Sequence, residues 1–199
     1  MKMDVKHFEV DDLRIKKPGK YVKVIELLPD EVITKHWVTK YTGIDLERDI
    51  LKLVVMECRA GSGKMGFGYV KGFGLSKGAI AESFTADAGT IICVGKSDED
   101  IASAIRRVAQ LQGGVAIVAG GMILNDLKVG GHGKSAEISF DAMSEKMKEL
   151  HETAHGLGCK LEDPFSALSL LSLPSIPELR ITDHGLLDVS RAKIIDLFE

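Results

Sequence analysis

The stretch Gly68-Tyr-Val-Lys-Gly-Phe-Gly-Leu-Ser-Lys-Gly-Ala-Ile-Ala81 decides how the middle of this chain can fold. With the residues just before it, it places seven glycines in the eighteen positions 61–78. This density disfavours a long helix and predicts strands with tight turns and close backbone approach. The run Gly61-Ser-Gly-Lys64 resembles the end of a phosphate-binding loop. Cys58 and Met65 stand where that motif needs glycine and Ser or Thr, so we interpret the run as a turn.

Short runs rich in β-branched residues predict strands on both sides of this region. Before it, three such runs are separated by turn residues, and after it two apolar runs are bounded by glycines. The predicted strands are residues 21–28, 31–38, 50–56, 89–95 and 115–119.

Helices are predicted in the second half of the chain. Ser97 can cap the first, and the acidic residues 98–100 complement the positive end of its dipole. Its apolar face consists of Ile101, Ala104, Ile105, Val108 and Leu111. A second helix is predicted over residues 141–157 and a short apolar one over 164–173. Together with the strands, these helices predict an α+β fold with mixed or antiparallel β-sheets and two to three packed helices, as a single domain over residues 1–199.

Composition and charge narrow the range of partners. The chain is 45% hydrophobic and 28% charged, with a formal net charge of −3 and a pI near 6.1. It has no basic stripe, so we expect neither nucleic acid nor an anionic membrane as a partner. No signal peptide and no membrane-spanning run is recognised, and the three scattered cysteines are typical of buried thiols in a reducing compartment. We therefore expect a cytoplasmic protein.

The run His151-Glu-Thr-Ala-His155 is a literal H-E-x-x-H on a predicted helix, the spacing at which two histidines can hold zinc. The apolar stripe of that helix centres near Met143 and Ala154. At about 100° per residue, His151 and His155 fall about 80° and 120° from that centre, so they flank a solvated face. They are weak metal candidates, and we expect no metal and no cofactor in this chain.

A second informative stretch is Asp163–Val189, D-P-F-S-A-L-S-L-L-S-L-P-S-I-P-E-L-R-I-T-D-H-G-L-L-D-V. Together and in this order, it and the glycine-rich stretch resemble the C-terminal domain of bacterial and archaeal adenine deaminases. The similarity covers nearly the whole chain. Residues 47–55 look like the family's acidic-basic entry to a strand, and residues 91–95 and 98–100 follow in register.

The resemblance implies that domains of this kind are parts of an enzyme. In that family the domain follows an amidohydrolase barrel, whose histidine and aspartate ligands hold the divalent metal that activates water for the conversion of adenine to hypoxanthine. A chain of 199 residues leaves no room for the barrel, so we expect a stand-alone homologue.

The polar motifs of the family are altered in this chain. An Arg-His pair is here Cys58-Arg59, and an Ala-His-Asp-Ser-His-Asn motif is here Thr85-Ala-Asp-Ala-Gly-Thr90, in which Asp87 survives. A Leu-Pro-x-x-Gly-Leu-Met-Ser motif is here residues 129–136, which keep Gly133. Framework glycines, prolines and apolar strands are retained, whereas histidines able to move protons are replaced.

These departures favour a non-catalytic accessory or interaction domain related to adenine deaminase, in purine salvage. We expect it to be inactive alone, and to form a homo-oligomer or to pair with a separate barrel subunit. The leucine-rich segment 164–177 is a candidate associating surface, with ordinary core as an equally good interpretation. The alternative is a small purine-binding module, or a hydrolase acting with a partner barrel, that uses Asp87, Arg59 and Lys71 around the glycine-rich loops. A zinc hydrolase using His151 and His155 is the least favoured interpretation.

Overall fold

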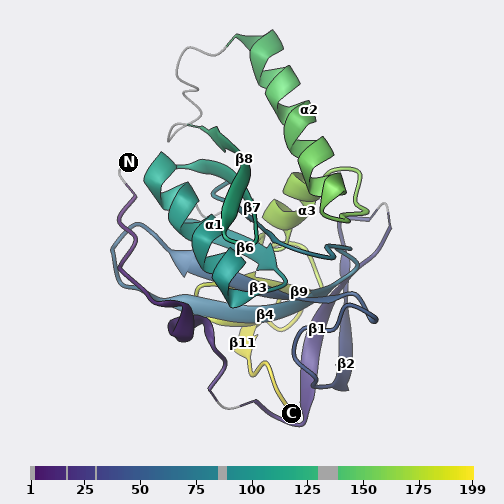
Figure 1. Ribbon diagram of the computed structural model, residues 1–199. Helices are drawn as coiled ribbons and strands as arrows, with labels where there is room; N and C mark the ends of the chain where they lie inside the picture. The colour runs from purple at the N-terminus through teal and green to yellow at the C-terminus, as the bar shows by residue number, and fades with distance from the viewer. Residues whose placement is uncertain (1–2, 17, 30, 85–88, 130–138) are drawn as a thin grey trace.

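A mixed sheet of eight strands forms the centre of the structure, a computed structural model that describes residues 3–16, 18–29, 31–84, 89–129 and 139–199 (Figure 1). A smaller three-stranded sheet and the helices pack around it. In chain order the elements are η1 (Val10–Leu13), β1 (Tyr21–Leu27), β2 (Thr34–Lys40), β3 (Ile50–Glu57), β4 (Met65–Lys71), β5 (Ala79–Glu82), β6 (Thr90–Gly95), α1 (Asp98–Leu111), β7 (Gly114–Ala119), β8 (Met122–Lys128), α2 (Phe140–Gly156), α3 (Pro164–Leu170), β9 (Leu179–Thr182), β10 (Gly185–Asp188) and β11 (Lys193–Ile195).

The large sheet has the strand order β2-β1-β4-β3-β6-β5-β7-β8. Its β1 and β4 strands are parallel, and the other neighbours are antiparallel. The small sheet, in the order β11-β10-β9, is antiparallel throughout. The predicted α+β fold with mixed sheets and up to three α-helices is confirmed.

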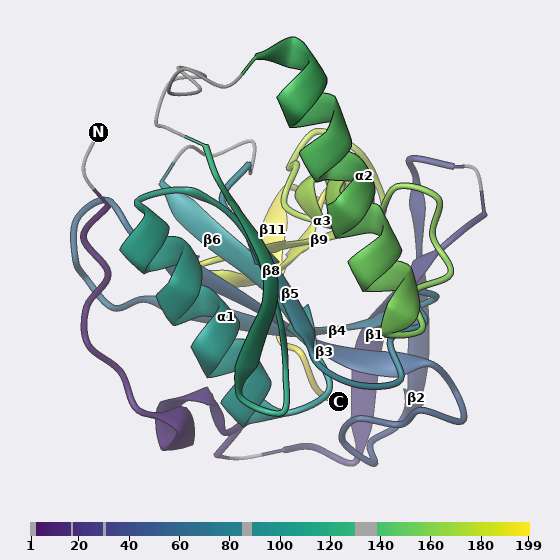
Figure 2. The same ribbon diagram turned by 45° about the horizontal axis from the view of Figure 1, so that its top comes forward.

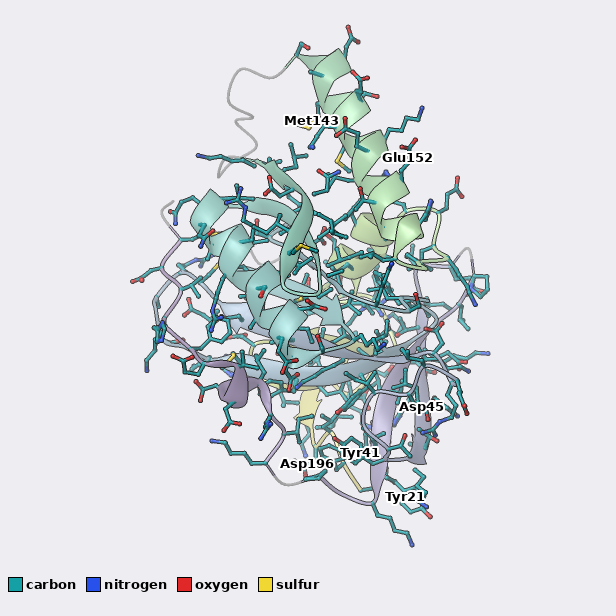
Figure 3. The ribbon with its side chains drawn as sticks, in the orientation of Figure 1. Tyr21, Tyr41, Asp45, Met143, Glu152 and Asp196 are labelled. Atoms are coloured by element: carbon teal, nitrogen blue, oxygen red, sulfur yellow. The ribbon has the colours of Figure 1, made fainter. Side chains whose placement is uncertain are left out.

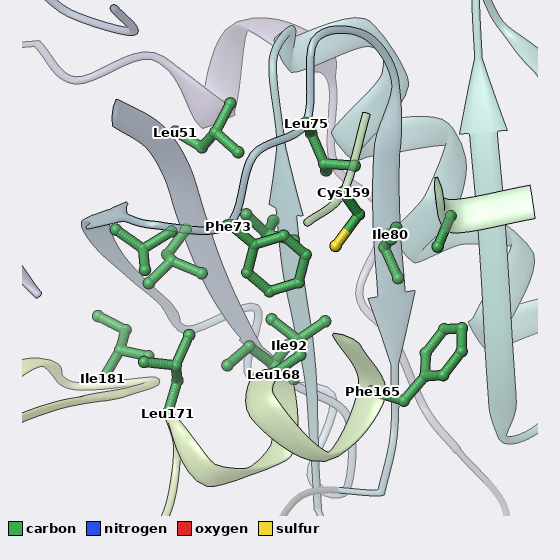
Figure 4. Packing of buried hydrophobic residues seen from close by; sticks show 14 of the residues in the cluster. Leu51, Phe73, Leu75, Ile80, Ile92, Cys159, Phe165, Leu168, Leu171 and Ile181 are labelled. Atoms are coloured by element: carbon green, nitrogen blue, oxygen red, sulfur yellow. The ribbon is translucent and has the colours of Figure 1, made fainter. Parts of the chain in front are cut away.

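The two faces of the large sheet carry different cores. Helix α1 covers one face over β5, β6 and β7, whereas α3 and the small sheet lie on the other (Figure 2). Because successive side chains on a strand point to opposite faces, Ala81 of β5 packs with the α1 core, and Ile80 packs with Phe165 and Leu168 of α3 (Figure 4).

The glycine-rich region forms β4 and the turns beside it, as predicted. Gly66 lies so close to the small sheet that a Cβ atom there would be 1.8 Å from the carbonyl oxygen of Thr182. Only a residue without a side chain fits at this crossing. The predicted close backbone approach is therefore confirmed.

Helix α1 begins directly after the predicted cap Ser97, and α2 begins one residue before its predicted start at residue 141. The hydroxyl of Ser97 accepts a hydrogen bond from the backbone N–H of Asp100 at the start of α1. In α2, Leu150 and Ala154 are buried, whereas Met143 is only partly covered. The first turns of α2 project away from the rest of the molecule (Figures 1 and 3).

The leucine-rich segment 164–177 belongs to the core. Phe165, Leu168 and Leu171 are at most 3% exposed. Their burial against the sheet supports the core interpretation for these side chains, whereas Leu170, Leu173 and Ile176 are partly exposed. Helix α3 also ends at Leu170, three residues earlier than predicted.

Exposed apolar side chains gather instead on the edge strand β8. Met122, Ile123 and Leu124 are 67%, 47% and 45% exposed. At the other edge of the sheet, β2 begins at Thr34, so the predicted strand 31–38 was placed too early. In the described part of the chain, no helix combines the length and the apolarity needed to cross a membrane.

Candidate functional site

Among the described acidic and basic residues, the side chains of Lys52, Glu82 and Arg180 are buried to 4% exposure or less, and they differ in their hydrogen-bond partners. The ammonium group of Lys52 lies 2.6 Å from a carboxylate oxygen of Asp98. The two terminal nitrogens of the Arg180 guanidinium donate to the Thr34 hydroxyl and to backbone carbonyls, while its Nε has no hydrogen-bond partner among the described residues. The carboxyl group of Glu82 contacts one hydroxyl, and its Oε2 atom has no hydrogen-bond partner among the described residues. An incompletely satisfied buried carboxyl group is costly, so Glu82 stands out.

Glu82 is the last residue of β5, in the middle of the large sheet. It pairs with Ile92 of β6 on one side and with Val115 of β7 on the other. The strand alternation that directs Ile80 toward α3 also directs Glu82 toward this helix. Its side chain is fully buried there and reaches Ser169.

The contacts of Ser169 indicate which protonation state Glu82 has. The Ser169 Oγ atom lies 2.7 Å from Glu82 Oε1 and 3.0 Å from the backbone carbonyl oxygen of Phe84. A serine hydroxyl has a single hydrogen to donate, and a carbonyl can only accept. Ser169 is placed to donate to Glu82 and to the Phe84 carbonyl oxygen, which share its one hydrogen. One shared donor is little to stabilise a buried carboxylate, so the contacts favour a neutral carboxylic acid.

Electrostatics agree with this assignment. The pKa of Glu82 is raised to about 8: burial is the largest cause, the hydrogen bond from Ser169 lowers the pKa in part, and the negative charge of Asp163 raises it. At neutral pH Glu82 therefore carries its proton.

Glu82 and Asp163 both line a cavity of about 380 Å³. Its wall is largely apolar and includes two aromatic rings. The lining residues are Glu82, Phe84, Met147, Asp163, Phe165, Ser166, Ser169 and Leu170.

Asp163 is the ionised partner of the neutral Glu82. Burial alone would raise the pKa of Asp163, but hydrogen bonds from the hydroxyl and N–H of Ser166 and from His151 hold it below its usual value. Two carboxyl groups whose pKa values are moved in opposite directions are typical of a functional site.

The two histidines of the H-E-x-x-H run have separate contacts. His151 lies 2.8 Å through Nδ1 from the Met147 carbonyl oxygen and 3.4 Å through Nε2 from an Asp163 oxygen. His155 lies 2.9 Å through Nε2 from the carbonyl oxygen of Leu161. Glu152 lies on the outer side of α2 (Figure 3). Within the described ranges, no group of three or more His, Cys, Asp or Glu side chains is placed to hold a metal ion.

Arg59 and Lys71 lie at opposite ends of β4. Arg59 follows the end of β3, where β4 begins, and Lys71 is the last residue of β4. At about 3.3 Å per residue, β4 separates them by about 20 Å. The ammonium group of Lys71 lies 2.6 Å from a Glu26 oxygen and 4.7 Å from the centre of the Trp37 ring. Asp87 lies outside the described residues, as do residues 130–136 of the altered third motif.

Sequence reasoning missed Glu82. The available signal was one acidic residue at the end of the apolar run Ala79-Ile-Ala-Glu82, on the same strand face as Ile80. An acid in that register of a buried strand indicates a satisfied or functional carboxyl group.

The fold and the site define a mixed-sheet α+β domain that holds a neutral carboxylic acid against an apolar cavity. The family model described as the adenine deaminase C-terminal domain matches residues 30–193. The chain belongs to this family, which confirms the resemblance seen in its motifs.

Three relatives named adenine deaminase show how the chain relates to longer proteins. The one from Dehalococcoides mccartyi is 40% identical over 199 residues, covering 97% of this chain and 35% of the relative. Those from Archaeoglobus fulgidus and Desulfatibacillum aliphaticivorans are 42% and 40% identical, covering 88% and 94% of this chain and 32% and 34% of the relative. The chain therefore spans about a third of the length of the relatives that it matches.

Proposed function

We propose that this chain is a non-catalytic accessory domain of adenine deamination, which works together with a metal-bearing barrel. The observation that carries the proposal is the coverage. Almost all of this chain aligns with about a third of each adenine deaminase, so its counterparts in those proteins act alongside a further two-thirds of chain. Purine salvage is the metabolic setting that the relatives' name supports.

The altered motifs support the accessory role. At the two positions of the second polar motif where the family resemblance implies histidines, this chain has Ala86 and Gly89. Neither residue can accept or donate a proton from its side chain, whereas general acid–base catalysis needs such a group. We assign the proton transfers of deamination to the barrel.

The exposed apolar run Met122–Leu124 is the surface that we assign to docking. It lies on an edge strand, whose outer backbone groups pair with no other strand in the described structure. Contiguous exposed apolar side chains are typical of interaction sites. The barrel is the occupant that we propose, and a second copy of this chain is the alternative. The buried thiols at Cys58, Cys93 and Cys159 suit a cytoplasmic location.

Reconstitution tests the proposal. The chain is mixed with metal-loaded Dehalococcoides mccartyi adenine deaminase from which the region matched by this chain has been removed, and adenine-dependent ammonia release is measured. We expect no turnover from the chain alone, weak turnover from the truncated enzyme and a several-fold gain from the mixture. Ile123→Glu should abolish the gain, whereas Val32→Glu, at a similarly exposed residue beside the opposite sheet edge, should not.

Two outcomes would contradict the accessory role. Rapid ammonia release by the metal-replete chain without a partner would show that it is catalytic. A mixture that forms no complex and gains no rate would show that it does not serve a barrel. Size-exclusion chromatography of the chain alone reports whether it self-associates instead.

The purine-binding alternative needs Arg59 and Lys71 to contact the same ligand, and they lie too far apart for that. Their separation of about 20 Å along β4 exceeds the reach of one purine base. A ligand site using either residue would therefore need its other contacts nearby.

A further inference from the structure

We propose that the cavity between the end of β1 and helix α3 binds a linear aliphatic diamine, which has an ammonium group at each end and an uncharged methylene chain between them. This chain alone supplies the lining residues, so the proposal does not depend on a barrel partner. The cavity shares Asp163, Ser166 and Leu170 with the smaller cavity beside Glu82, but Glu82 does not line it.

The floor of the cavity is apolar. Its side chains come from the end of β1 and from α3 and the residue after it, and include Leu27, Leu28, Ala167, Leu170 and Leu171. The volume is about 590 Å³, within the range of small-molecule sites. Methylene groups that lie on this floor leave water, which favours binding. None of the described lining residues is aromatic, so an aliphatic chain fits better than a flat ring.

Accessible carboxylates surround this floor. The charged side chains of the rim are Glu31, Asp49, Glu162, Asp163 and Lys160. Four carboxylates against one ammonium group give the rim a formal charge of −3. Glu31 and Glu162 are exposed and form no ion pair with a described residue, and the Asp163 side chain is 50% exposed. Their oxygens can therefore attract and contact the ammonium groups of a ligand.

A positive charge under the floor limits where the ligand can carry its own charge. Arg180 also lines the cavity but is fully buried, and its terminal nitrogens donate to Thr34 and to backbone carbonyls. No carboxylate of a described residue forms an ion pair with it. Because this guanidinium group has no exposed surface, it cannot contact an anion, yet its charge repels a cation over the floor. The ammonium groups of the ligand therefore lie at the rim, with uncharged methylene groups between them.

The distribution of the carboxylates favours a diamine over a divalent metal ion. Glu31 follows β1, Asp49 precedes β3, and Glu162 and Asp163 precede α3. In the described part of the chain, no group of three or more His, Cys, Asp or Glu side chains is placed to hold a metal ion. Carboxylates that come from three separate loops suit a ligand with two separated cationic groups.

Ligand-induced thermal stabilisation tests the proposal at pH 7 and constant ionic strength. The probes are 1,4-diaminobutane, 1,6-diaminohexane and 1,8-diaminooctane, compared with spermidine, 1,6-hexanediol, adipate and MgCl2. We expect the best of the three diamines to raise Tm by about 4 °C at ten times its Kd. Spermidine should bind more weakly than that diamine despite its higher charge, because its central ammonium group lies over Arg180. The uncharged diol and the anionic adipate should give no shift.

Substitutions at the rim and the floor identify the site, with Kd measured by isothermal titration calorimetry. Glu31→Gln and Glu162→Gln should each weaken binding of the best diamine about threefold, and Lys160→Met should strengthen it about threefold. Ala167→Leu, which fills part of the floor, should weaken it about tenfold. The matched control Glu152→Gln removes the same charge from an exposed side chain of α2 outside the cavity and should leave Kd unchanged. The three rim residues are exposed, so the test does not depend on whether Ala167→Leu folds.

Three results would overturn the proposal. The first is the absence of a shift with all three diamines. The second is a Kd that is the same for wild type, Glu31→Gln and Glu162→Gln, which would place the diamine elsewhere. The third is a larger shift with MgCl2 or spermidine than with any diamine, which would assign the rim to another kind of cation. Because no ammonia is measured, failure here is separate from failure of the accessory role.

Discussion

Glu57 and Glu82 end two strands on either side of β6, yet their surroundings are opposite. Glu57 is the last residue of β3 and pairs with Thr90, whereas Glu82 is the last residue of β5 and pairs with Ile92. The carboxylate of Glu57 accepts three backbone N–H groups and a hydroxyl. Glu82 has the single contact with Ser169. The same residue type is thus an anion in one region and a neutral acid in the other.

The difference follows from the hydrogen bonds that each region offers. Partial burial raises the pKa of Glu57, but hydrogen bonds from Ala60, Ser62 and Arg59 lower it by more, and the resulting pKa is about 2. The turn that resembles a phosphate-binding loop therefore directs its N–H groups at a carboxylate of its own chain. At Glu82 burial dominates, and the pKa rises to about 8. One acid organises a turn, whereas the other stays neutral in the core.

The largest expected effect is on the pH dependence of stability. The usual pKa of glutamate is 4.5, and that of native Glu82 is about 8. Between these two pH values, native Glu82 keeps a proton that the unfolded chain releases. The free energy of unfolding should therefore fall as pH rises, by about 1.4 kcal/mol per pH unit from this group. Below that window both states are protonated and the contribution is constant. Urea unfolding of wild type and Glu82→Gln from pH 4 to 9 measures the difference, and parallel curves would contradict it.

Replacing the acid should stabilise the protein. At pH 8, Glu82→Leu should raise the free energy of unfolding by about 2 kcal/mol, because a buried, incompletely paired carboxyl group is replaced by an apolar side chain of similar size. The shift in the midpoint of urea unfolding at pH 8 gives the change. A loss of stability would mean that Glu82 makes favourable native interactions that its contacts do not reveal.

The corresponding change in the Glu57 turn should have the opposite sign. Glu57→Gln at pH 7 should lower the free energy of unfolding by about 1.5 kcal/mol, because two charge-assisted acceptors become one neutral carbonyl and one amino group. Since the pKa of native Glu57 is depressed, its contribution is present above pH 4.5 and is lost as pH falls through about 2. Unfolding of both proteins at pH 7 and pH 3 checks this, with a smaller difference expected at pH 3.

The smallest expected effect is at Ser169. Ser169→Ala should lower the free energy of unfolding by about 1 kcal/mol at pH 6, because it leaves the Glu82 carboxyl group and the Phe84 carbonyl without their shared partner. It should also shift the pH-dependent loss of stability to higher pH. Ser166→Ala, on the same helix, serves as control, since its hydroxyl bonds Asp163 and not Glu82. A shift with Ser166→Ala alone would assign the control of Glu82 to Asp163.

The sequence predicted the elements whose signals are local. Ser97 and the apolar spacing of α1 determine that helix. The glycines of β4 predict a close backbone approach, and the structure shows that the partner is β9. Strand β8 was not predicted, although the pair Gly120-Gly121 before it is a hairpin signal. The short strands β10 and β11 carry too few residues for a pattern.

The site depends on contacts that no local pattern encodes. Glu82 is one acid at the end of a four-residue strand. Its state is determined mainly by burial, and Ser169 and Asp163, which lie far along the chain, modify it. Short motifs such as the H-E-x-x-H run indicated candidate residues, but a motif does not show which side chains surround those residues in the fold. His151 does reach the cavity wall, but through Asp163 and not through a metal-binding arrangement with His155.

The crossing at Gly66 limits how this protein can change by mutation. Any side chain there collides with a main-chain oxygen at residue 182, an atom that every amino acid carries. No second-site substitution at residue 182 can relieve such a collision, so intragenic suppressors of a Gly66 mutation should not arise at the contact itself. They would have to move a whole sheet.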